Sequence, residues 1–354
     1  PLPPAAFAMT EFELIERFFK RRSRTAVLGN GDDCALVAPA PGNVFAITTD
    51  TLVAGRHFLP SITPGRLGRR AVHVNLSDLA AMGAAPRYAL LSLTLPEIDE
   101  SWVAAFAAGL WAALDEFEVE LVGGNTTRGP MAIALTALGD VPPGQVLTRT
   151  GACPGDELWV SGPVGDAGWA LTALLQDGDG AGELVITASP AQIDKYECPT
   201  ARVALGLALR GVASSCIDIS DGLLSEAQHL ASASGVDIDI DIVAIPTGIT
   251  DVDRSDVGQA APVMNTVATG NERDRILRAR LAQHCLLATG DTYELLFTAP
   301  SSRHDDVVRL LAAQDLAGAC IGRVTTSANR PAVRVLDAQS RLMNIESKGW
   351  DHFA

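Results

Sequence analysis

Residues 71–83, AVHVNLSDLAAMG, place one acid within an otherwise largely apolar helical pattern, and the predicted fold extends outward from them. Asp78 lies seven residues after Ala71 and four after Val74, so the helical period puts its side chain on the face that should point inward. A carboxylate on such a face is costly unless it is paired or bound to a metal ion. The residues alone leave open whether Asp78 is a cap, a buried acceptor or a metal ligand.

Helical and strand-like segments alternate on both sides of this stretch. A helix is predicted over 66–83, between the strand VFAITTD and the strand YALLSLTLP. In the second half, the strand SSCIDIS precedes the helix DGLLSEAQHLASAS, and the strand VDIDIDIV follows it. Mixed layers of helix and sheet, α/β or α+β, are therefore expected.

Two turn-rich stretches, VPPG at 141–144 and CPGD at 153–156, divide the chain. Its 354 residues also suggest two domains, at roughly 100–200 residues per domain. Residues 1–8 have neither the basic region nor the apolar core of a signal peptide. The predicted divisions are an N-terminal domain over 9–148, a C-terminal domain over 149–354 and an extension over 1–8.

Composition excludes several classes of protein. With 27 basic and 42 acidic residues, the net charge of −15 argues against nucleic acid or an anionic membrane as a partner. The apolar stretch near 102–114 is shorter than the roughly 20 residues that cross a bilayer. Six scattered cysteines without a CxxC pair make a zinc ribbon or a thioredoxin-type site unlikely. A reduced, cytoplasmic protein is expected.

The common nucleotide-binding signatures are missing. The sequence contains no GxxxxGK[ST] and no HRD with DFG, which argues against a P-loop enzyme or a protein kinase. Its three lysines do not follow a glycine-rich turn between strand and helix. The segment GNGDDC resembles half of a dinucleotide-binding fingerprint, but it lacks the third glycine and does not open a helix.

A group of acids stands at loops and strand ends. Asp33 lies in GNGDDC, Asp50 ends ITTD, and Asp218 and Asp221 flank Ser220 in CIDISDGL. Carboxylates next to glycine or hydroxyl residues suit Mg²⁺, which prefers oxygen ligands and usually binds one or two carboxylates together with substrate phosphates. Taken singly, each of these acids is better explained by turn or capping chemistry. Only the group favours a metal site.

Three further features have both a structural and a functional interpretation. The alternating acids of VDIDIDIV predict a strand with one solvated acidic face. His57, in AGRHF, is a surface or capping histidine or a substrate contact. Trp350, in the terminal GWDHF, docks the C-terminus or contacts a substrate.

Taken together, the motifs resemble one family, thiamine-monophosphate kinase, within the aminoimidazole-ribonucleotide synthetase-like superfamily. The resemblance runs in order along the chain from Met9 onward, and its segments TTDTLVAGRHF and NLSDLAAMGA separate this kinase from its relatives. The other matching segments are GNGDDCAL, LVGGNTTRGP, LTRTGACPGDELWVSGPVGD, CIDISDGL, TYELLFT and KGWDHF.

The resemblance implies an activity and an assembly. It implies ATP-dependent phosphorylation of thiamine monophosphate to thiamine diphosphate, by direct in-line transfer and with several Mg²⁺ ions. It also implies the two-domain aminoimidazole-ribonucleotide synthetase-like fold and a homodimer formed through the sheet of the N-terminal domain. The co-substrate is ATP, and neither nucleic acid nor membrane is expected as a partner.

Site residues carried over by motif fall into three sets. The metal set is Asp33, Thr48, Thr49, Asp50, Asp78, Asn125, Asp218 and Asp221. The ATP-binding set is Gly124, Asn125, Arg149 and Ser220, and the substrate-binding set is His57, Asp291 and Trp350. No residue is expected to act covalently.

Two departures from the family pattern bear on activity. Where the family has GGDTT this chain has GGNTT, so that Asn125 replaces an expected carboxylate ligand. Thr289 and Thr292 replace an expected Gly and Asp in the segment TGDTYEL. Weaker metal binding at Asn125 is expected. Two alternatives follow: another ATP-using member of the superfamily, or a catalytically weakened paralogue that binds nucleotide or thiamine phosphate.

Overall fold

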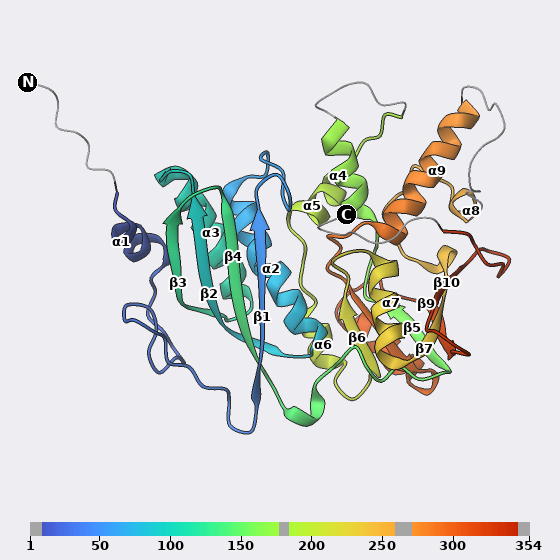
Figure 1. Ribbon diagram of the computed structural model, residues 1–354, viewed down its shortest axis with the longest axis horizontal. Coiled ribbons are helices and arrows are strands. Elements are labelled where there is room, and N and C mark those ends of the chain that lie inside the picture. Colours follow the sequence, from blue (N-terminus) through green and yellow to red (C-terminus); the bar gives the residue numbers. More distant parts are fainter. Residues whose placement is uncertain (1–8, 177–183, 259–270, 346–354) are drawn as a thin grey trace, which may run out of the picture. The chain divides into compact units, whose positions relative to one another are not determined.

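The computed structural model describes residues 9–176, 184–258 and 271–345 (Figure 1). The chain forms two compact units. The N-terminal unit comprises Pro1–Leu79 and Ala85–Pro143, and the C-terminal unit comprises Ala80–Ala84 and Gly144–Ala354. Within the described ranges, no helix is both long enough and apolar enough to cross a membrane.

The N-terminal unit is a four-stranded sheet in the order β1-β4-β2-β3, with helices on one face (Figure 1). The strands β4 and β2 bury alternate residues, which is the period expected of a sheet covered on one side. The two edge strands are β1 and β3. The elements are α1 (Glu11–Leu14) with a π-helical turn (Ile15–Phe19), β1 (Val44–Val53), α2 (Pro64–Ala81), β2 (Ala85–Leu95), α3 (Glu100–Glu116), β3 (Glu120–Arg128) and β4 (Ala132–Val141).

Glycines allow α2 and α3 to approach each other at backbone distance. A Cβ atom on Gly109 of α3 would lie 1.9 Å from the carbonyl oxygen of Gly65 in α2. One turn later, a Cβ atom on Gly68 would lie 2.2 Å from the carbonyl oxygen of Phe106. Both neighbours are backbone atoms, which have little freedom to move aside. This crossing fixes the position of α2, the helix that carries Asp78.

The opposite face of this sheet is exposed in the single chain. Ile47 is 65% exposed, and Val53 and Leu90 are 38% and 37% exposed. Ile47, Thr49, Thr51 and Val53 follow one another on this face because side chains alternate along β1. The N-terminal unit therefore presents an apolar and hydroxyl-rich sheet surface, called the open face below.

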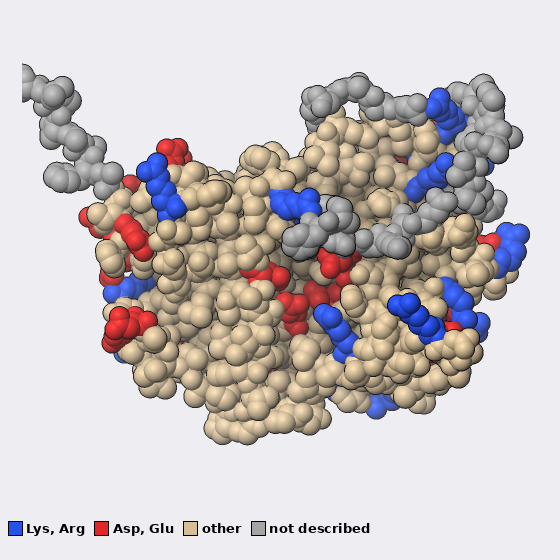
Figure 2. Space-filling view, in the orientation of Figure 1, with Lys and Arg blue, Asp and Glu red and all other residues tan. Residues whose placement is uncertain are grey.

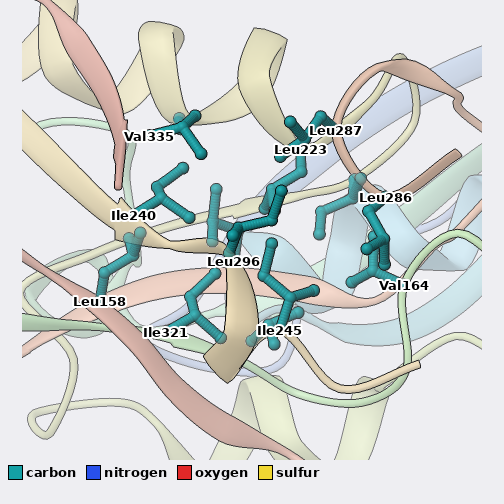
Figure 3. Packing of buried hydrophobic residues seen from close by; sticks show 14 of the residues in the cluster. Leu158, Val164, Leu223, Ile240, Ile245, Leu286, Leu287, Leu296, Ile321 and Val335 are labelled. Atoms are coloured by element: carbon teal, nitrogen blue, oxygen red, sulfur yellow. The ribbon is translucent and has the colours of Figure 1, made fainter. Parts of the chain in front are cut away.

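The C-terminal unit is built around a six-stranded sheet in the order β10-β7-β9-β5-β8-β6. Within it, β10 and β7 pair in parallel and the other described pairs are antiparallel. Figure 3 shows part of the core, in which Leu158, Ile240 and Leu296 pack together. The strands are β5 (Asp156–Val160), β6 (Ser215–Asp218), β7 (Val236–Asp241), β8 (Leu295–Pro300), β9 (Ala319–Thr326) and β10 (Val333–Leu336).

Helices and single turns surround this sheet. α7 follows β6 directly, and a left-handed Gly235 ends it before β7. The helices are α4 (Asp166–Gln176), α5 (Pro190–Glu197), α6 (Val203–Ala208), α7 (Leu223–Ser234), α8 (Arg254–Val257), α9 (Asn271–Ala288) and α10 (His304–Ala313), with 3-10 turns at Pro143–Gln145, Ile242–Ala244 and Ser301–Arg303.

The prediction of a solvated acidic face on VDIDIDIV is wrong for two of its three acids. Asp237 and Asp239 are buried. Arg334 of β10 lies 3.3 Å from Asp237 and 2.6 Å from Asp239, and Arg323 of β9 lies 3.8 Å from Asp239. The strands on both sides of β7 supply these arginines, and the pattern of β7 alone does not contain that information.

The Gly109 crossing gives a stability prediction. We expect Gly109→Ala to lower the free energy of unfolding by about 1–3 kcal/mol, the usual cost of overpacking. Alanine favours a helix over glycine by only about 0.5–1 kcal/mol, so the clash should dominate. The control is Gly144→Ala, where a Cβ atom meets nothing within 4 Å. Equal urea midpoints for the two variants would contradict the proposed crossing.

Candidate active site

In the N-terminal unit, β1 and α2 hold three of the predicted metal residues together. The hydroxyl of Thr48 donates to a carboxylate oxygen of Asp78 at 2.5 Å. The N–H of Asp50 donates to the side-chain oxygen of Asn75 at 3.0 Å, one turn before Asp78. Asn75 in turn donates to the carbonyl of Ala71 at 2.9 Å, which fixes its amide. Asp78 thus faces β1, in keeping with the inward-pointing face that the helical period predicts.

Thr49 lies on the other side of β1. Its hydroxyl donates to the carbonyl of Leu135 at 3.2 Å and accepts from Thr136 at 3.0 Å. The strand alternation that turns Thr48 and Asp50 toward α2 turns the Thr49 side chain toward the open face. Thr49 can therefore contribute to a metal site with Asp50 and Asp78 through a backbone atom rather than through its hydroxyl.

Gly124 and Asn125 lie on β3, the edge strand opposite β1. The register aligns Asp50, Leu135, Leu91 and Gly124 in one row across the sheet. Three strand spacings, about 14 Å, separate the two edges. Gly124 has φ +152°, and a Cβ atom there would lie 1.9 Å from the carbonyl oxygen of Leu91, so this position requires glycine.

Asn125 occupies the next row of the sheet. It aligns with Ser92 of β2, which aligns with Ala134 of β4 and through it with Thr51 of β1. Asn125 and Ser92 are both exposed. This row belongs to the open face, so alternation turns the Asn125 side chain away from the face that carries Asp50.

The glycine-rich segment that contains Asp33 is tied to the same edge of the sheet. The amide of Asn30 donates to the carbonyl of Leu121 in β3 at 3.2 Å and to that of Phe19 at 3.3 Å. Asp33 itself is exposed, and its N–H donates to the carboxylate of Asp32 at 2.9 Å. Asn30 thus anchors the segment that carries Asp33 beside β3.

His57 lies half-buried in the turn that follows β1. Its Nδ1 accepts the N–H of Val53 at 3.0 Å. In the neutral ring the proton is therefore on Nε2. Arg70 of α2 donates to the carbonyl of His57 at 3.2 Å, which anchors the turn to the helix.

In the C-terminal unit, two loops form one surface through backbone hydrogen bonds. The N–H of Asp291 donates to the carbonyl of Ser220 at 2.9 Å, and that of Tyr293 donates to the carbonyl of Ile219 at 2.8 Å. The N–H of Ile219 donates to the carbonyl of Glu294 at 2.9 Å. These bonds extend the pairing of β6 with β8 and bring Ser220 beside Asp291. We call this arrangement the loop ladder.

The loop ladder needs close approach and unusual backbone angles. A Cβ atom on Gly290 would lie 2.0 Å from the carbonyl oxygen of Ser220. Asp291 and Tyr293 have φ of 61° and 51°, which few non-glycine residues adopt. Such strain persists only where the surrounding structure over-determines it, and it clusters at functional sites.

A buried glutamate anchors the C-terminal end of the ladder. Glu294 is 1% exposed and accepts hydrogen bonds from Ser161 at 2.6 Å, Lys195 at 2.8 Å and Arg202 at 2.7 Å. Burial alone would raise the pKa of Glu294, but the hydrogen bond from Arg202 and the charges of Lys195 and Arg202 hold it below its ordinary value. The glutamate is therefore ionised and forms ion pairs with two basic side chains of this unit, Lys195 and Arg202.

A second buried glutamate supports the predicted metal residues. Glu226 is 2% exposed, and its Oε1 accepts the N–H of Asp221 at 3.0 Å. Its Oε2 is buried and lacks a hydrogen-bond partner within the described ranges. Burial, and then the charges of Asp221 and Asp218, raise the pKa of Glu226 to about 8. The sequence motifs do not single out Glu226. Its one sequence signal is an acid in the first turn of the helix that follows SDG.

The remaining predicted residues lie as follows. Asp218 is buried at the end of β6, Asp221 and Asp291 are half-buried, and Ser220 is exposed. Arg149 is exposed, and its carbonyl accepts from Ser234 at 3.2 Å. Thr292 is 6% exposed, and its hydroxyl has no partner in the part of the chain that the structure describes. Trp350 lies outside the described residues.

The donor chemistry fits a hard divalent cation. A hydroxyl and a carboxylate meet at Thr48 and Asp78, and the carboxylate of Glu226 holds the backbone of Asp221. Across the described residues, no three His, Cys, Asp or Glu side chains group tightly enough to hold a metal ion by themselves. Such small sets suit Mg²⁺, which keeps several waters and shares its coordination with substrate phosphates.

Comparison with known proteins shows which family the chain belongs to. The family model described as AIR synthase related protein, N-terminal domain, matches residues 31–141, and the corresponding C-terminal domain matches residues 153–332. The thiamine-monophosphate kinase of Salmonella typhimurium is 39% identical over 350 residues, which is 98% of this chain and 99% of that protein. The chain belongs to the thiamine-monophosphate kinase family.

Solved structures agree with this family. The thiamine-monophosphate kinase from Stenotrophomonas maltophilia K279a has a TM-score of 0.72 and 36% identity, covering 87% of this chain and 90% of that one. The structure of AaThiL complexed with AMPPCP and TMP has a TM-score of 0.67 and 30% identity, covering 89% of each chain. The fold class predicted from the sequence, two aminoimidazole-ribonucleotide synthetase-like domains of mixed helix and sheet, is confirmed.

Proposed function

We propose that this chain is a thiamine-monophosphate kinase, which transfers the γ-phosphoryl group of ATP to thiamine monophosphate and produces thiamine diphosphate and ADP. The observation that carries the proposal is full-length similarity, at 39% identity, to a protein of that name. A relative at 30% identity whose structure is described as complexed with AMPPCP and TMP supports it.

Direct in-line transfer is the mechanism that these residues support. Phosphoryl transfer requires alignment and charge neutralisation rather than covalent help from the protein. Both substrates are anionic, and the chain carries a net charge of −15. The two described lysines are already ion-paired, Lys20 with Glu16 and Lys195 with Glu294. When bound, Mg²⁺ would supply the positive charge that neutralises the phosphates.

Each unit contributes oxygen ligands in the proposal. Thr48, Asp50 and Asp78, held together by β1 and α2, would bind cations in the N-terminal unit. Asp218 and Asp221, at the start of the loop ladder, would bind them in the C-terminal unit. The other proposed contacts are Asp33, Thr49 and Asn125 for metal, Gly124, Asn125, Arg149 and Ser220 for ATP, and His57, Asp291 and Trp350 for the substrate.

We further infer a homodimer formed through the open face. Ile47, Val53 and Leu90 expose apolar side chains there, and a second copy would cover them. We expect light scattering to give about twice the 37.0 kDa of one chain, and Ile47→Asp to halve that mass. A monomeric wild-type protein, or an Ile47→Asp variant that stays dimeric, would contradict this interface.

The activity is tested by measuring ADP release with ATP, Mg²⁺ and thiamine monophosphate. We expect release that depends on this acceptor. Asp78→Asn should reduce kcat by about 100-fold or more, because a lost ligand charge weakens phosphate neutralisation by several kcal/mol. The matched control is Asp99→Asn, which alters only the cap of α3 and should keep nearly full activity.

Three outcomes separate the hypotheses. Release with another phosphate acceptor and not with thiamine monophosphate would indicate a different member of the superfamily. Tight binding of nucleotide and thiamine monophosphate without release would indicate a paralogue that binds without turnover. Equal loss of activity in Asp78→Asn and Asp99→Asn would show that the β1–α2 residues have no special role.

The same assay tests Asn125, where the family pattern has aspartate. We expect Asn125→Asp to lower the Mg²⁺ concentration needed for half-maximal rate, because it adds a charged oxygen ligand at the edge strand β3. The comparison is a Mg²⁺ titration of the wild type and the variant. If neither the Mg²⁺ requirement nor kcat changes, Asn125 is not a metal position.

A further inference from the structure

The carboxyl group of Glu226 has a second oxygen that its known hydrogen bond does not use. It lies in the first turn of α7 and reaches back to the N–H of Asp221, at 3.0 Å from Oε1. This contact satisfies the backbone donor of the residue that precedes Gly222, the N-cap of α7. A glutamine could make the same contact without burying a carboxyl group.

The second oxygen of Glu226 is the unexplained part. Oε2 is fully buried, in a side chain that is only 2% exposed, and lacks a hydrogen-bond partner among the described residues. A buried polar atom in this state costs free energy. A buried oxygen that lacks a partner in the described part of the chain, in the side chain that holds the backbone of Asp221, therefore points to a bound group.

We propose that Glu226 is a positioning residue for the cation assigned above to Asp221. Oε1 fixes the backbone of Asp221, and Oε2 accepts a hydrogen bond from a water molecule in the hydration shell of that ion. The inference rests on the proposed function only for the presence of Mg²⁺ with nucleotide at this turn.

An indirect contact agrees better with the structure than direct ligation. Asp218, Asp221 and Glu226 do not form a ready three-ligand metal site within the described ranges. Mg²⁺ gives up its waters reluctantly, so an acceptor one water away is a common way to orient it. Outer-shell partners of this kind typically change metal affinity by about 10–100-fold when they are removed.

The test is Glu226→Gln, which keeps the Oε1 acceptor and exchanges Oε2 for an NH₂ group of similar size. We expect the Kd for Mg²⁺, measured by titration calorimetry with ADP present, to rise about 10–100-fold. In EDTA the melting temperature should stay about equal, because glutamine keeps the size of the side chain and the Oε1 contact with Asp221. The matched control is Glu120→Gln, a buried glutamate that accepts the N–H groups of Arg24 and Thr25 in the other unit. It should leave the Kd for Mg²⁺ unchanged.

Two results would overturn the inference. One is an unchanged Kd for Mg²⁺ in Glu226→Gln, which would make Glu226 a cap and nothing more. The other is a Glu226→Gln variant that melts earlier or fails to fold in EDTA, because a purely structural carboxylate would then be the explanation.

If the proposed function is wrong, the pattern of results is different. Wild-type protein that binds Mg²⁺ with ADP, shows the weakened Kd in Glu226→Gln and yet transfers no phosphoryl group to thiamine monophosphate would retain the positioning role and lose the kinase activity. Normal phosphoryl transfer by the wild type, together with an unchanged Kd for Mg²⁺ in Glu226→Gln, would support the kinase activity and contradict the positioning role.

Discussion

Three backbone hydrogen bonds join the end of β6 to the loop before β8, and the candidate site of the C-terminal unit depends on this loop ladder. It brings Ser220 beside Asp291 at the cost of positive φ angles at Asp291 and Tyr293. Glu294 maintains that backbone because its buried carboxylate is held by Ser161, Lys195 and Arg202. The strain near the candidate site is thus balanced by a charge network one residue beyond it.

The distribution of charge explains why such a site would need cations from outside. Lys and Arg side chains stand in several separate groups on the face drawn in Figure 2. Among the described residues, several basic side chains are already paired: Lys195 and Arg202 with Glu294, and Arg334 with Asp237 and Asp239. Phosphates approaching Asp218 or Asp78 would meet carboxylates. In the proposed function divalent ions would reverse that repulsion, and Thr48 with Asp78 in one unit and Asp221 in the other would offer them oxygen ligands.

Sequence patterns predicted the features that depend on near neighbours. The helical period placed Asp78 on the inward face of its helix, where it meets Thr48, and motif order predicted the family that the comparisons confirm. Features that depend on distant partners were missed or wrong. Glu294 meets Ser161 across 133 residues, and Asp239 is covered by Arg334 across 95. The strand order β1-β4-β2-β3 separates Asn125 from Asp50 on opposite edges of one sheet, which no local pattern reveals. The proposed site roles themselves stay predictions.

The central claim is that cations, and not protein side chains, supply the positive charge that binds phosphate. Its most direct test is calorimetric titration of the wild-type protein with ATP, in Mg²⁺ and again in EDTA, at one ionic strength. The account predicts that removing Mg²⁺ raises the Kd for ATP by at least about tenfold, or about 1.4 kcal/mol. Equal affinity in both buffers would contradict it, because the protein alone would then neutralise the nucleotide.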